Sequence, residues 1–496
     1  MKRLYKAFIP VAVTVMAVAA LAPGCGDPAD PNEGKQDTIV VDPDYSAKKF
    51  LRDEYMDVYY YWYKEVKAVN SKINLKNYGI YDLFDMMLYS KDRWSWMCDK
   101  EYYVGSETGV VSGTYGASLG QPFEYHGDYD IRVRYVYPGS PFAEQGVTRG
   151  WTLTHINGEK TMNLIRTGDF STYYSKSPQT FTFEDLDGTP HTFTATASES
   201  LSTHSSLIAK VFTASDFPGL TEPVGYFLYL SFKANFLEDI AQAMESFRAA
   251  GVKTVILDLR YNGGGDSRAS QLLVDYLAPE SQTGKVYVNR IHNDLLSSMD
   301  EQTVVRPKDN KGDFVGVPDP VTGENRIVNS IGAERIYVIT GEGSASASEM
   351  VTNGLRPMMD VKMVGDTTYG KPNGMYVLMY PGSNDDYKKY NAGDFTKLKW
   401  VFLPICFYNK NGQGQSIPDD GFIPDNYRPD DLYHDFGVEE DNIKACLTHI
   451  VTGAFPSLPF PHGYTTRSSS HGRIDLTEES TNPAYGLYTV MPKNRF

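Results

Sequence analysis

Ser346 and Lys371 are two residues of complementary chemistry that lie 25 positions apart. A serine hydroxyl becomes a strong nucleophile only when a neighbouring base takes its proton, and a lysine can act as that base once burial has lowered its pKa. Ser346 also stands three residues before Glu349, in the S-x-x-E pattern of a helix capping box, and this pattern alone would make it an ordinary helix N-cap. The fold decides between the two interpretations, because the serine can react only if Lys371 is returned to it.

The elements predicted around the pair can bring the two residues together. The apolar run 336–339 is short, β-branched and followed by glycines, which predicts a buried strand, and the helix that begins at Ser346 follows it. A second apolar run, 361–364, precedes the Tyr-Gly-Lys-Pro turn that contains Lys371. A strand in this position would return the lysine to the start of the helix.

The run Gly343-Ser-Ala-Ser-Ala-Ser-Glu349 and the turn Tyr369-Gly-Lys-Pro372 resemble the signature of the carboxyl-terminal processing proteases, serine peptidase family 41. The resemblance implies that Ser346 is the nucleophile and that Lys371 is its general base. It also implies that the backbone N–H of Ala347 is one donor of the oxyanion hole. No cofactor and no metal are expected for this chemistry.

The resemblance also indicates where a third polar group could stand. In several members of the family, an aspartate eleven positions after the serine or a glutamine four positions after the lysine orients the lysine. Here these positions hold Pro357 and Met375, so neither group is present. Glu349 is the nearest substitute in the sequence.

Residues 252–267, VKTVILDLRYNGGGDS, predict a buried strand that runs into a glycine-rich loop. They resemble the family's L-D-L-R-N-N-P-G-G segment, and the resemblance assigns the second oxyanion N–H to Gly264. Gly265 is the alternative, because Gly263 replaces the usual proline. The loop could also be a phosphate-binding turn or a tight strand-to-helix connection, although no Gly-Lys-Ser/Thr follows the glycines, as a P-loop requires.

Composition limits the other classes of function. The 496 residues predict two to four domains, and 41% hydrophobic with 22% charged residues exclude a wholly disordered or membrane-embedded chain. The net charge of −15, without a concentration of Lys and Arg, argues against a nucleic-acid partner. Three cysteines follow Cys25, an odd number without zinc-ligand spacing, so neither a disulfide framework nor a metal site is indicated. None of the nine histidines lies in the motif stretch, although His204 or His292 could approach it in space.

The N-terminus has the pattern of an exported protein. Residues 1–24 combine early positive charges with an uncharged apolar run, which predicts a signal peptide. Leu21-Ala-Pro-Gly-Cys25 resembles a bacterial lipobox, so we expect Cys25 to be lipidated and the protein to be a lipid-anchored lipoprotein of the bacterial cell envelope, facing the periplasm or the exterior. Simple secretion with an unpaired Cys25 is the alternative. Residues 25–44 are rich in Pro, Asp and Gly and predict a disordered tether.

Residues 45–104 predict an N-terminal helical region. Five large side chains at helical spacing predict a buried face between helices, with a substrate platform as the alternative; they are Tyr55, Tyr59, Trp62, Tyr63 and Val66. The segment 92–96 resembles the D-[RK]-[HF]-[ST] sequence that precedes the PDZ module in the family, and no chemistry is assigned to it.

Residues 108–200 resemble the PDZ module of the family, although Phe142 precedes the expected alanine and Trp151 replaces an aspartate. A PDZ domain binds a free C-terminus as an added strand while backbone N–H groups hold the carboxylate. The resemblance places this carboxylate-binding loop at Tyr115, Gly116, Ala117, Ser118 and Leu119. A rigid spacer that no longer binds peptide is the alternative.

Residues 205–430 alternate strands and helices, which predicts an α/β core. The resemblance implies a crotonase/ClpP-like spiral of ββα units for this peptidase core. A late core strand is expected over 400–408, and 420–425 resembles the family's G-[IV]-x-P-D segment. Residues 431–496 predict a C-terminal helix and a polar tail without catalytic residues.

The function expected from the sequence is a serine endopeptidase that cleaves protein or peptide substrates through a Ser-Lys dyad and an acyl-enzyme. Cleavage is expected near free C-termini, which the PDZ-like domain recognises. A catalytically silent envelope lipoprotein that binds peptides or small apolar ligands is the alternative, and a purely structural surface lipoprotein is a third class. The retained serine and lysine argue against both. The sequence leaves the oligomeric state open.

Overall fold

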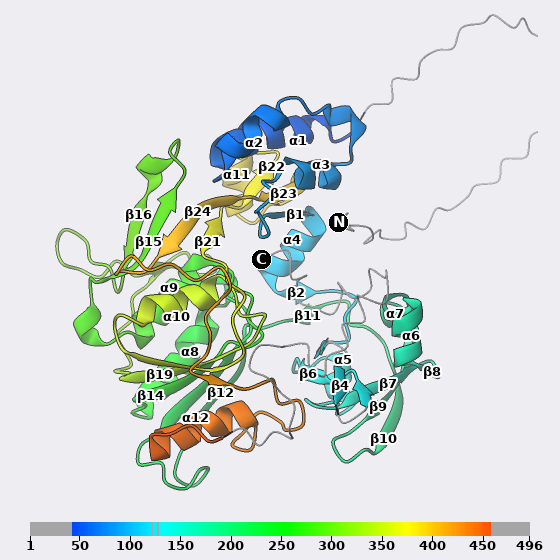
Figure 1. Cartoon of the computed structure of the whole chain (residues 1–496), viewed down its shortest axis with the longest axis vertical. Helices are drawn as coiled ribbons and strands as arrows, with labels where there is room; N and C mark the ends of the chain where they lie inside the picture. Colours follow the sequence, from blue (N-terminus) through cyan, green and yellow to red (C-terminus); the bar gives the residue numbers. More distant parts are fainter. Residues whose placement is uncertain (1–41, 121–122, 126–127, 458–496) are drawn as a thin grey trace, which may run out of the picture.

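A six-stranded sheet carries the segments on which the predicted chemistry depends (Figure 1). The computed structural model describes residues 42–120, 123–125 and 128–457, so the signal peptide, Cys25, most of the tether and the tail beyond residue 457 lie outside the described residues. In sheet order the strands are β12 Ser206–Phe212, β13 Val224–Tyr229, β14 Thr254–Asp258, β19 Arg335–Thr340, β20 Asp360–Gly365 and β25 Asn426–Tyr427. All neighbours are parallel except β12, which pairs antiparallel with β13.

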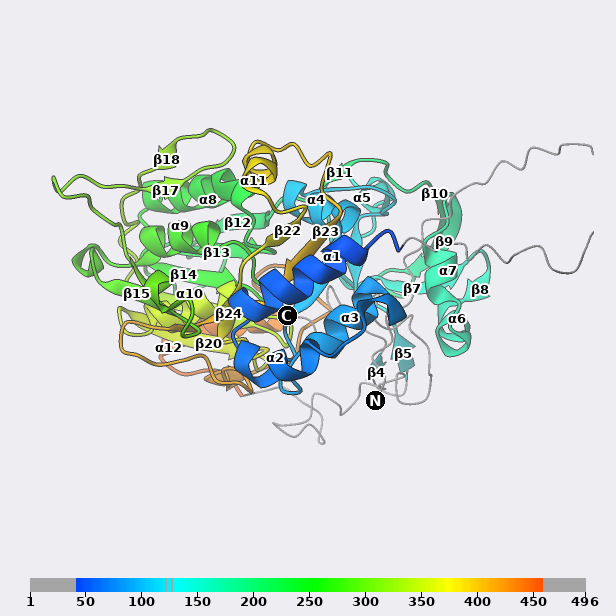
Figure 2. The same cartoon turned by 90° about the horizontal axis from the view of Figure 1, so that it is seen from above.

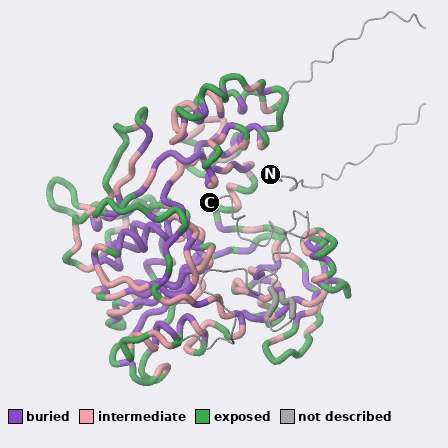
Figure 3. Tube along the Cα trace, viewed as in Figure 1, coloured by how far each residue is buried: buried purple, intermediate pink, exposed green. Residues whose placement is uncertain are grey.

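Both faces of this sheet are covered by helices, which explains why consecutive residues in the middle of its central strands are apolar, as at 255–257 and 336–339. Alternate side chains of a strand point to opposite faces. Val255 and Leu257 of β14 pack with the helices α8 Leu237–Ala249, α9 Ser267–Leu277 and α10 Ala347–Leu355, whereas Ile256 between them packs with α12 Asp441–Thr452. Figure 3 shows that buried residues concentrate in this part of the molecule. The mixed α/β core expected from the sequence is confirmed.

A second sheet stands beside the first, in the order β16, β15, β24 and β21, with bounds Glu301–Val304, Val286–His292, Ile405–Lys410 and Asn373–Met375. A third sheet contains β1 Trp96–Asp99, β23 Trp400–Leu403 and β22 Leu378–Tyr380. The prediction of one strand over 400–408 is therefore wrong. The chain changes sheets at Pro404, whose missing N–H and fixed φ interrupt a strand ladder.

The N-terminal helices lie on this third sheet (Figure 2). They are α1 Tyr45–Phe50, the π-helix η1 Leu51–Tyr59, α2 Tyr63–Asn70 and α3 Ile80–Met87, and α4 Lys100–Thr108 follows β1. Tyr55, Tyr63 and Val66 are buried here, and Tyr59 and Trp62 pack against the same cluster, so the buried face predicted for these side chains is present. The helix is not continuous, however, because the backbone becomes extended at Tyr60.

A β-rich unit over residues 110–202 has a hydrophobic cluster of its own, with Phe142 fully buried at its centre. Its strands are β2 Val110–Val111, β3 Ala117–Leu119, β4 Phe123–Tyr125, β5 Asp128–Asp130, β6 Val133–Val136, β7 Thr152–Ile156, β8 Glu159–Lys160, β9 Gln179–Glu184, β10 Pro190–Ala195 and β11 Leu201–Ser202. Its helices are α5 Pro141–Glu144, α6 Thr161–Thr167 and α7 Phe170–Tyr174. The remaining elements of the chain are β17 Val317–Pro318, β18 Asn325–Arg326 and α11 Asn384–Asn391.

The three cysteines of the described part, Cys98, Cys406 and Cys446, are buried and form no disulfide. Within residues 42–457, as far as they are described, no helix is both long and apolar enough to cross a bilayer. The same residues bring together no group of three or more His, Cys, Asp or Glu side chains that could hold a metal ion.

The buried ring of Phe402 in β23 stacks on Phe84 of α3. Replacing Phe402 therefore tests how much this contact between the N-terminal helices and the third sheet contributes to stability. Phe402→Ala should lower the free energy of unfolding by about 3–5 kcal/mol, the usual cost of a large cavity. It should also speed hydrogen exchange in α1 to α3. Leu295→Ala, at an exposed leucine, is the control and should change stability little. An unchanged unfolding midpoint for Phe402→Ala would contradict this packing.

Candidate active site

Ser346 lies at the turn between β19 and α10, as the sequence predicted, and is the residue immediately before the helix. Its backbone has φ 56° and ψ −111°, a left-handed conformation that is costly for a residue with a Cβ. Two hydrogen bonds hold it there: the N–H of Ser346 donates to Glu349 Oε2 at 3.0 Å, and the N–H of Met350 donates to the Ser346 carbonyl at 2.7 Å. The side chain is half-buried, and Ala347 is the first residue of the helix.

Lys371 follows β20 in a turn that packs against the serine loop. The N–H of Tyr369 donates to the carbonyl of Ser344 at 2.9 Å, so the lysine turn and the loop before Ser346 share a hydrogen bond. Lys371 is only 6% exposed. Burial lowers the pKa of Lys371 to about 8, while the negative charges of Asp92 and Glu349 oppose that fall. The lysine therefore changes between its charged and neutral forms close to neutral pH.

Met375 and Pro357, the two positions where the family resemblance indicated a polar group beside the lysine, carry none. Met375, four residues after the lysine, does contact its ammonium, since Nζ lies 3.7 Å from Met375 Sδ. A thioether sulfur is only a weak hydrogen-bond acceptor. Pro357, eleven residues after the serine, stands just beyond the end of α10 at Leu355.

Glu349 connects the serine and the lysine through their backbones. The carboxylate is fully buried and accepts four hydrogen bonds. Oε1 accepts from Thr368 Oγ1 at 2.6 Å and from the Gly370 N–H at 2.7 Å, while Oε2 accepts from the N–H groups of Ser346 at 3.0 Å and Lys371 at 2.8 Å. Burial raises the pKa of Glu349, and these four donors counteract the rise. One side chain thus fixes the start of α10 and the lysine turn to each other.

Gly264 lies directly against the start of α10. Its φ is 103°, and a Cβ added to it would stand 2.7 Å from Ser346 Cβ and 3.0 Å from the nitrogen of Ala347. Only glycine fits this approach. The N–H of Gly264 donates to Asn262 Oδ1 at 2.9 Å, so it is engaged within the loop in this structure. The alternative donor, Gly265, lies against Phe232 in an isolated parallel bridge.

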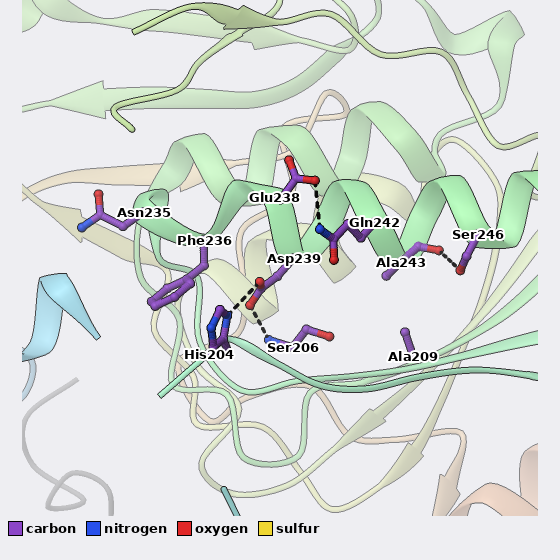
Figure 4. Close-up of a pocket in the computed structure, with 10 residues that line it drawn as sticks. All are labelled: His204, Ser206, Ala209, Asn235, Phe236, Glu238, Asp239, Gln242, Ala243 and Ser246. Atoms are coloured by element: carbon purple, nitrogen blue, oxygen red, sulfur yellow. Dashed lines mark hydrogen bonds and ion pairs between the residues drawn. The ribbon is translucent and has the colours of Figure 1, made fainter. Parts of the chain in front are cut away.

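The two histidines that could have approached the serine have other partners. His292 Nδ1 lies 3.0 Å from Asp300 and its Nε2 lies 2.8 Å from the Tyr376 hydroxyl. His204 Nδ1 lies 3.1 Å from Asp239, on the wall of a pocket of about 520 Å³ between α8 and β12 (Figure 4). Neither Ser346 nor Lys371 lines this pocket, so the pocket and the candidate site are separate places.

The residues proposed for carboxylate binding lie in the β-rich unit. Tyr115 is buried and stacks on Phe142 at 5.1 Å, while Ala117, Ser118 and Leu119 form β3, which pairs with β6. Gly116 has φ 80°, and a Cβ there would stand 2.1 Å from Ser140 Cβ. In the described part of the chain, no strand pairs with the other edge of β3.

Asp92 is a residue to which the sequence assigned no chemistry, yet its charge acts on Lys371. No spacing rule could find it, because the two residues are 279 positions apart in the sequence (371 − 92). The only signal was the resemblance of 92–96 to a family segment without an assigned role.

The pKa of Lys371 can be measured directly. In protein carrying ¹³C-labelled lysine, the Lys371 signal, assigned by its loss in Lys371→Met, should titrate with a midpoint near pH 8 because burial disfavours the ammonium. A midpoint near the ordinary value of 10.5 would show that the side chain is solvated.

The described chain is similar to known proteins in the region of this site. Residues 223–395 match the model of Peptidase family S41. The "Probable CtpA-like serine protease" of Staphylococcus haemolyticus is 26% identical over 191 residues, 38% of this chain and 32% of that protein. The carboxy-terminal processing protease CtpB of Bacillus subtilis is 26% identical over 165 residues, 32% of this chain and 28% of that protein. The chain thus matches only about a third of the length of these relatives.

A crystal structure of a Bacteroides fragilis protein assigned to the S41 proteases resembles the chain with a TM-score of 0.60 at 21% identity, covering 80% of this chain and 96% of that one. At this identity the likeness shows the fold alone. Residues 223–395, which contain the serine and lysine segments, thus match peptidase family S41, and the related processing proteases support the same family.

Proposed function

We propose that the protein is a serine-type peptidase in which Ser346 is the nucleophile and Lys371 is the general base. The observation that carries this proposal is the Glu349 carboxylate, which binds the backbone N–H groups of both residues. A lysine that is 6% exposed, with a pKa of about 8, can take a proton near neutral pH. The names of the related processing proteases support the same class of reaction.

The reaction proceeds by acyl transfer. Ser346 Oγ attacks the carbonyl carbon of the substrate peptide bond while neutral Lys371 takes the hydroxyl proton. The C–N bond then breaks, and Lys371 gives the proton to the leaving amine. Lys371 next deprotonates a water molecule, which attacks the ester, and the proton returns to Ser346 Oγ as the new carboxylic acid leaves.

The negative oxygen of the two tetrahedral intermediates needs preorganised donors. The N–H of Ala347 is the first donor in this proposal, at the positive end of the α10 dipole. The N–H of Gly264 is the second, and it has to exchange Asn262 Oδ1 for the substrate oxygen. Gly265 is the alternative.

The substrate class is part of the proposal. The β-rich unit acts as the PDZ-like domain, and β3, which pairs with β6 alone among the described strands, accepts a free C-terminus as an added strand. We infer that the core is the ββα spiral of the family. We also infer that the protein is exported and held at the bacterial cell envelope through a lipid on Cys25.

Replacing the dyad tests the reaction. Ser346→Ala, Lys371→Ala and Lys371→Arg should each lower kcat by several orders of magnitude, with unchanged circular dichroism, because residues that act as a unit fail together. Arginine cannot rescue the lysine, since it does not deprotonate in proteins. In the original protein, kcat/KM for a denatured protein substrate should rise with pH, with a midpoint near pH 8, as Lys371 loses its proton.

Two results would contradict the dyad. One is a Lys371→Ala protein that keeps most of its turnover. The other is a comparable loss in His204→Ala or His292→Ala, which should both stay active because neither histidine is bonded to the serine.

Recognition of a free C-terminus is tested with peptides that differ only at that end. A peptide ending in an apolar residue with a free carboxylate should be cleaved with a lower KM than its amidated version, because backbone N–H groups bind an anionic carboxylate more strongly than a neutral amide. Binding of both peptides to the inactive Ser346→Ala protein, measured by fluorescence anisotropy, removes turnover from the comparison. Equal affinity for both would leave the β-rich unit a spacer.

A further inference from the structure

We propose that Asp92 is a positioning residue for Lys371, and that the N-terminal helical region is thereby part of the active site. Its role in turnover rests on the proposed function. The charge coupling between the two residues does not, and it can be measured on an inactive protein.

The Asp92 carboxylate is held in one orientation. The side chain is 1% exposed. Oδ1 accepts from the N–H groups of Trp94 at 2.9 Å and Ser95 at 3.0 Å, and Oδ2 accepts from the Tyr60 hydroxyl at 2.8 Å. The Tyr60 oxygen in turn accepts from the N–H of Tyr89 at 3.0 Å. Three parts of the N-terminal region thus fix this one buried charge.

The residues that follow Asp92 bind the lysine turn directly. Arg93 Nη2 donates to the Gly370 carbonyl at 2.9 Å, and Trp94 Nε1 donates to the same oxygen at 3.2 Å. Arg93 also donates to the carbonyl of Asp419. Gly370 immediately precedes the lysine and gives its own N–H to Glu349. The peptide groups on both sides of Gly370 are therefore held, one from α10 and one from the N-terminal region.

Two carboxylates act on the Lys371 charge, and they differ in what else they do. The two oxygens of Glu349 accept hydrogen bonds from backbone and hydroxyl donors of the serine and lysine segments. Asp92 exerts the larger influence on Lys371, and both raise its pKa against burial. Arg93, Tyr60 and Tyr408 are further charged or titratable groups at this site. The Arg93 guanidinium binds Gly370, and the Tyr60 phenol, whose pKa is raised by burial and then by Asp92, donates to Asp92. The pKa of the Tyr408 phenol is raised by burial, then by Asp419 and Tyr61, and to a smaller extent by Asp92.

Asp92, in the N-terminal region, therefore supplies the anionic group that the lysine turn itself does not contain. Met375 offers the ammonium only a thioether, and Pro357 offers no polar group. When Lys371 takes the serine proton it becomes a cation in a buried place, where an unpaired charge is costly. A fixed anion nearby stabilises that cation during the attack. It also keeps the lysine pKa near 8 rather than lower.

Asp92→Asn tests this inference by removing the charge while keeping the size and one acceptor oxygen. Because Asp92 raises the Lys371 pKa, its loss should lower that pKa by about one unit, as is usual for a single nearby charge. The ascending limb of kcat/KM against pH should move to lower pH by the same amount, and the plateau kcat should fall about tenfold. The Lys371 ¹³C midpoint, measured in the Ser346→Ala background, should fall in parallel.

Two variants serve as matched controls. Asp99→Asn makes the same change in the same region, at a carboxylate that caps α4 by accepting the Tyr102 N–H. It should change neither the pH dependence of kcat/KM nor the Lys371 ¹³C titration midpoint. Asp92→Glu restores the charge on a longer stem and should return the limb toward its original pH even if the plateau stays low. Thermal unfolding of each variant shows that it is folded.

A folded Asp92→Asn protein with an unchanged Lys371 midpoint overturns the inference and leaves Asp92 a structural residue. If Asp92→Asn does not fold, Asp92→Ser, which also removes the charge, decides, and an unchanged Lys371 midpoint in that variant contradicts the inference. An inactive original protein in which the midpoint still responds to Asp92 would contradict the proposed peptidase function but support the coupling.

Discussion

The buried carboxylate of Glu349 is the interaction on which the site depends. It accepts the N–H of Ser346 and the N–H of Lys371, and so joins two segments that are separated by a helix and a strand. A buried carboxylate needs such donors, because an unpaired one would lose far more hydration energy than the fold could replace. The four hydrogen bonds therefore link the stability of the anion to the geometry of the Ser346 and Lys371 backbones. Displacing either segment would remove hydrogen-bond donors from the buried charge.

The parallel sheet explains why these segments meet. The loops after β14, β19 and β20 leave the carboxyl ends of three adjacent parallel strands, which lie at one edge of the sheet. This edge is where α/β proteins commonly bind ligands. The first loop brings Gly264, the second brings Ser346 and the third brings Lys371. The positive φ of Ser346 and the absence of a side chain at Gly264 then allow the approach that a substrate carbonyl would need.

Local sequence patterns predicted the strands, the helix after Ser346 and the glycine loop, because burial and capping leave a periodic signal within ten or so residues. The same patterns could not show where distant segments pack. The segment that contains Asp92 meets the lysine turn only through contacts between distant parts of the chain, such as that of Arg93 with Gly370, and Pro404 separates two sheets within a single apolar run. The engagement of the Gly264 N–H by Asn262 is likewise a property of loop geometry that composition does not encode. The predicted dyad and its oxyanion donors stay predictions until chemistry is measured.

The central claim is that Ser346 becomes a nucleophile because Lys371 removes its proton. Mass spectrometry of the protein after reaction with a peptidyl diphenyl phosphonate tests it most directly, since such a reagent marks an activated serine covalently. The account predicts one adduct, on Ser346, that forms faster as the pH rises through about 8 and is lost in Lys371→Ala. An adduct on another residue, or labelling of Ser346 at an undiminished rate without Lys371, would contradict it.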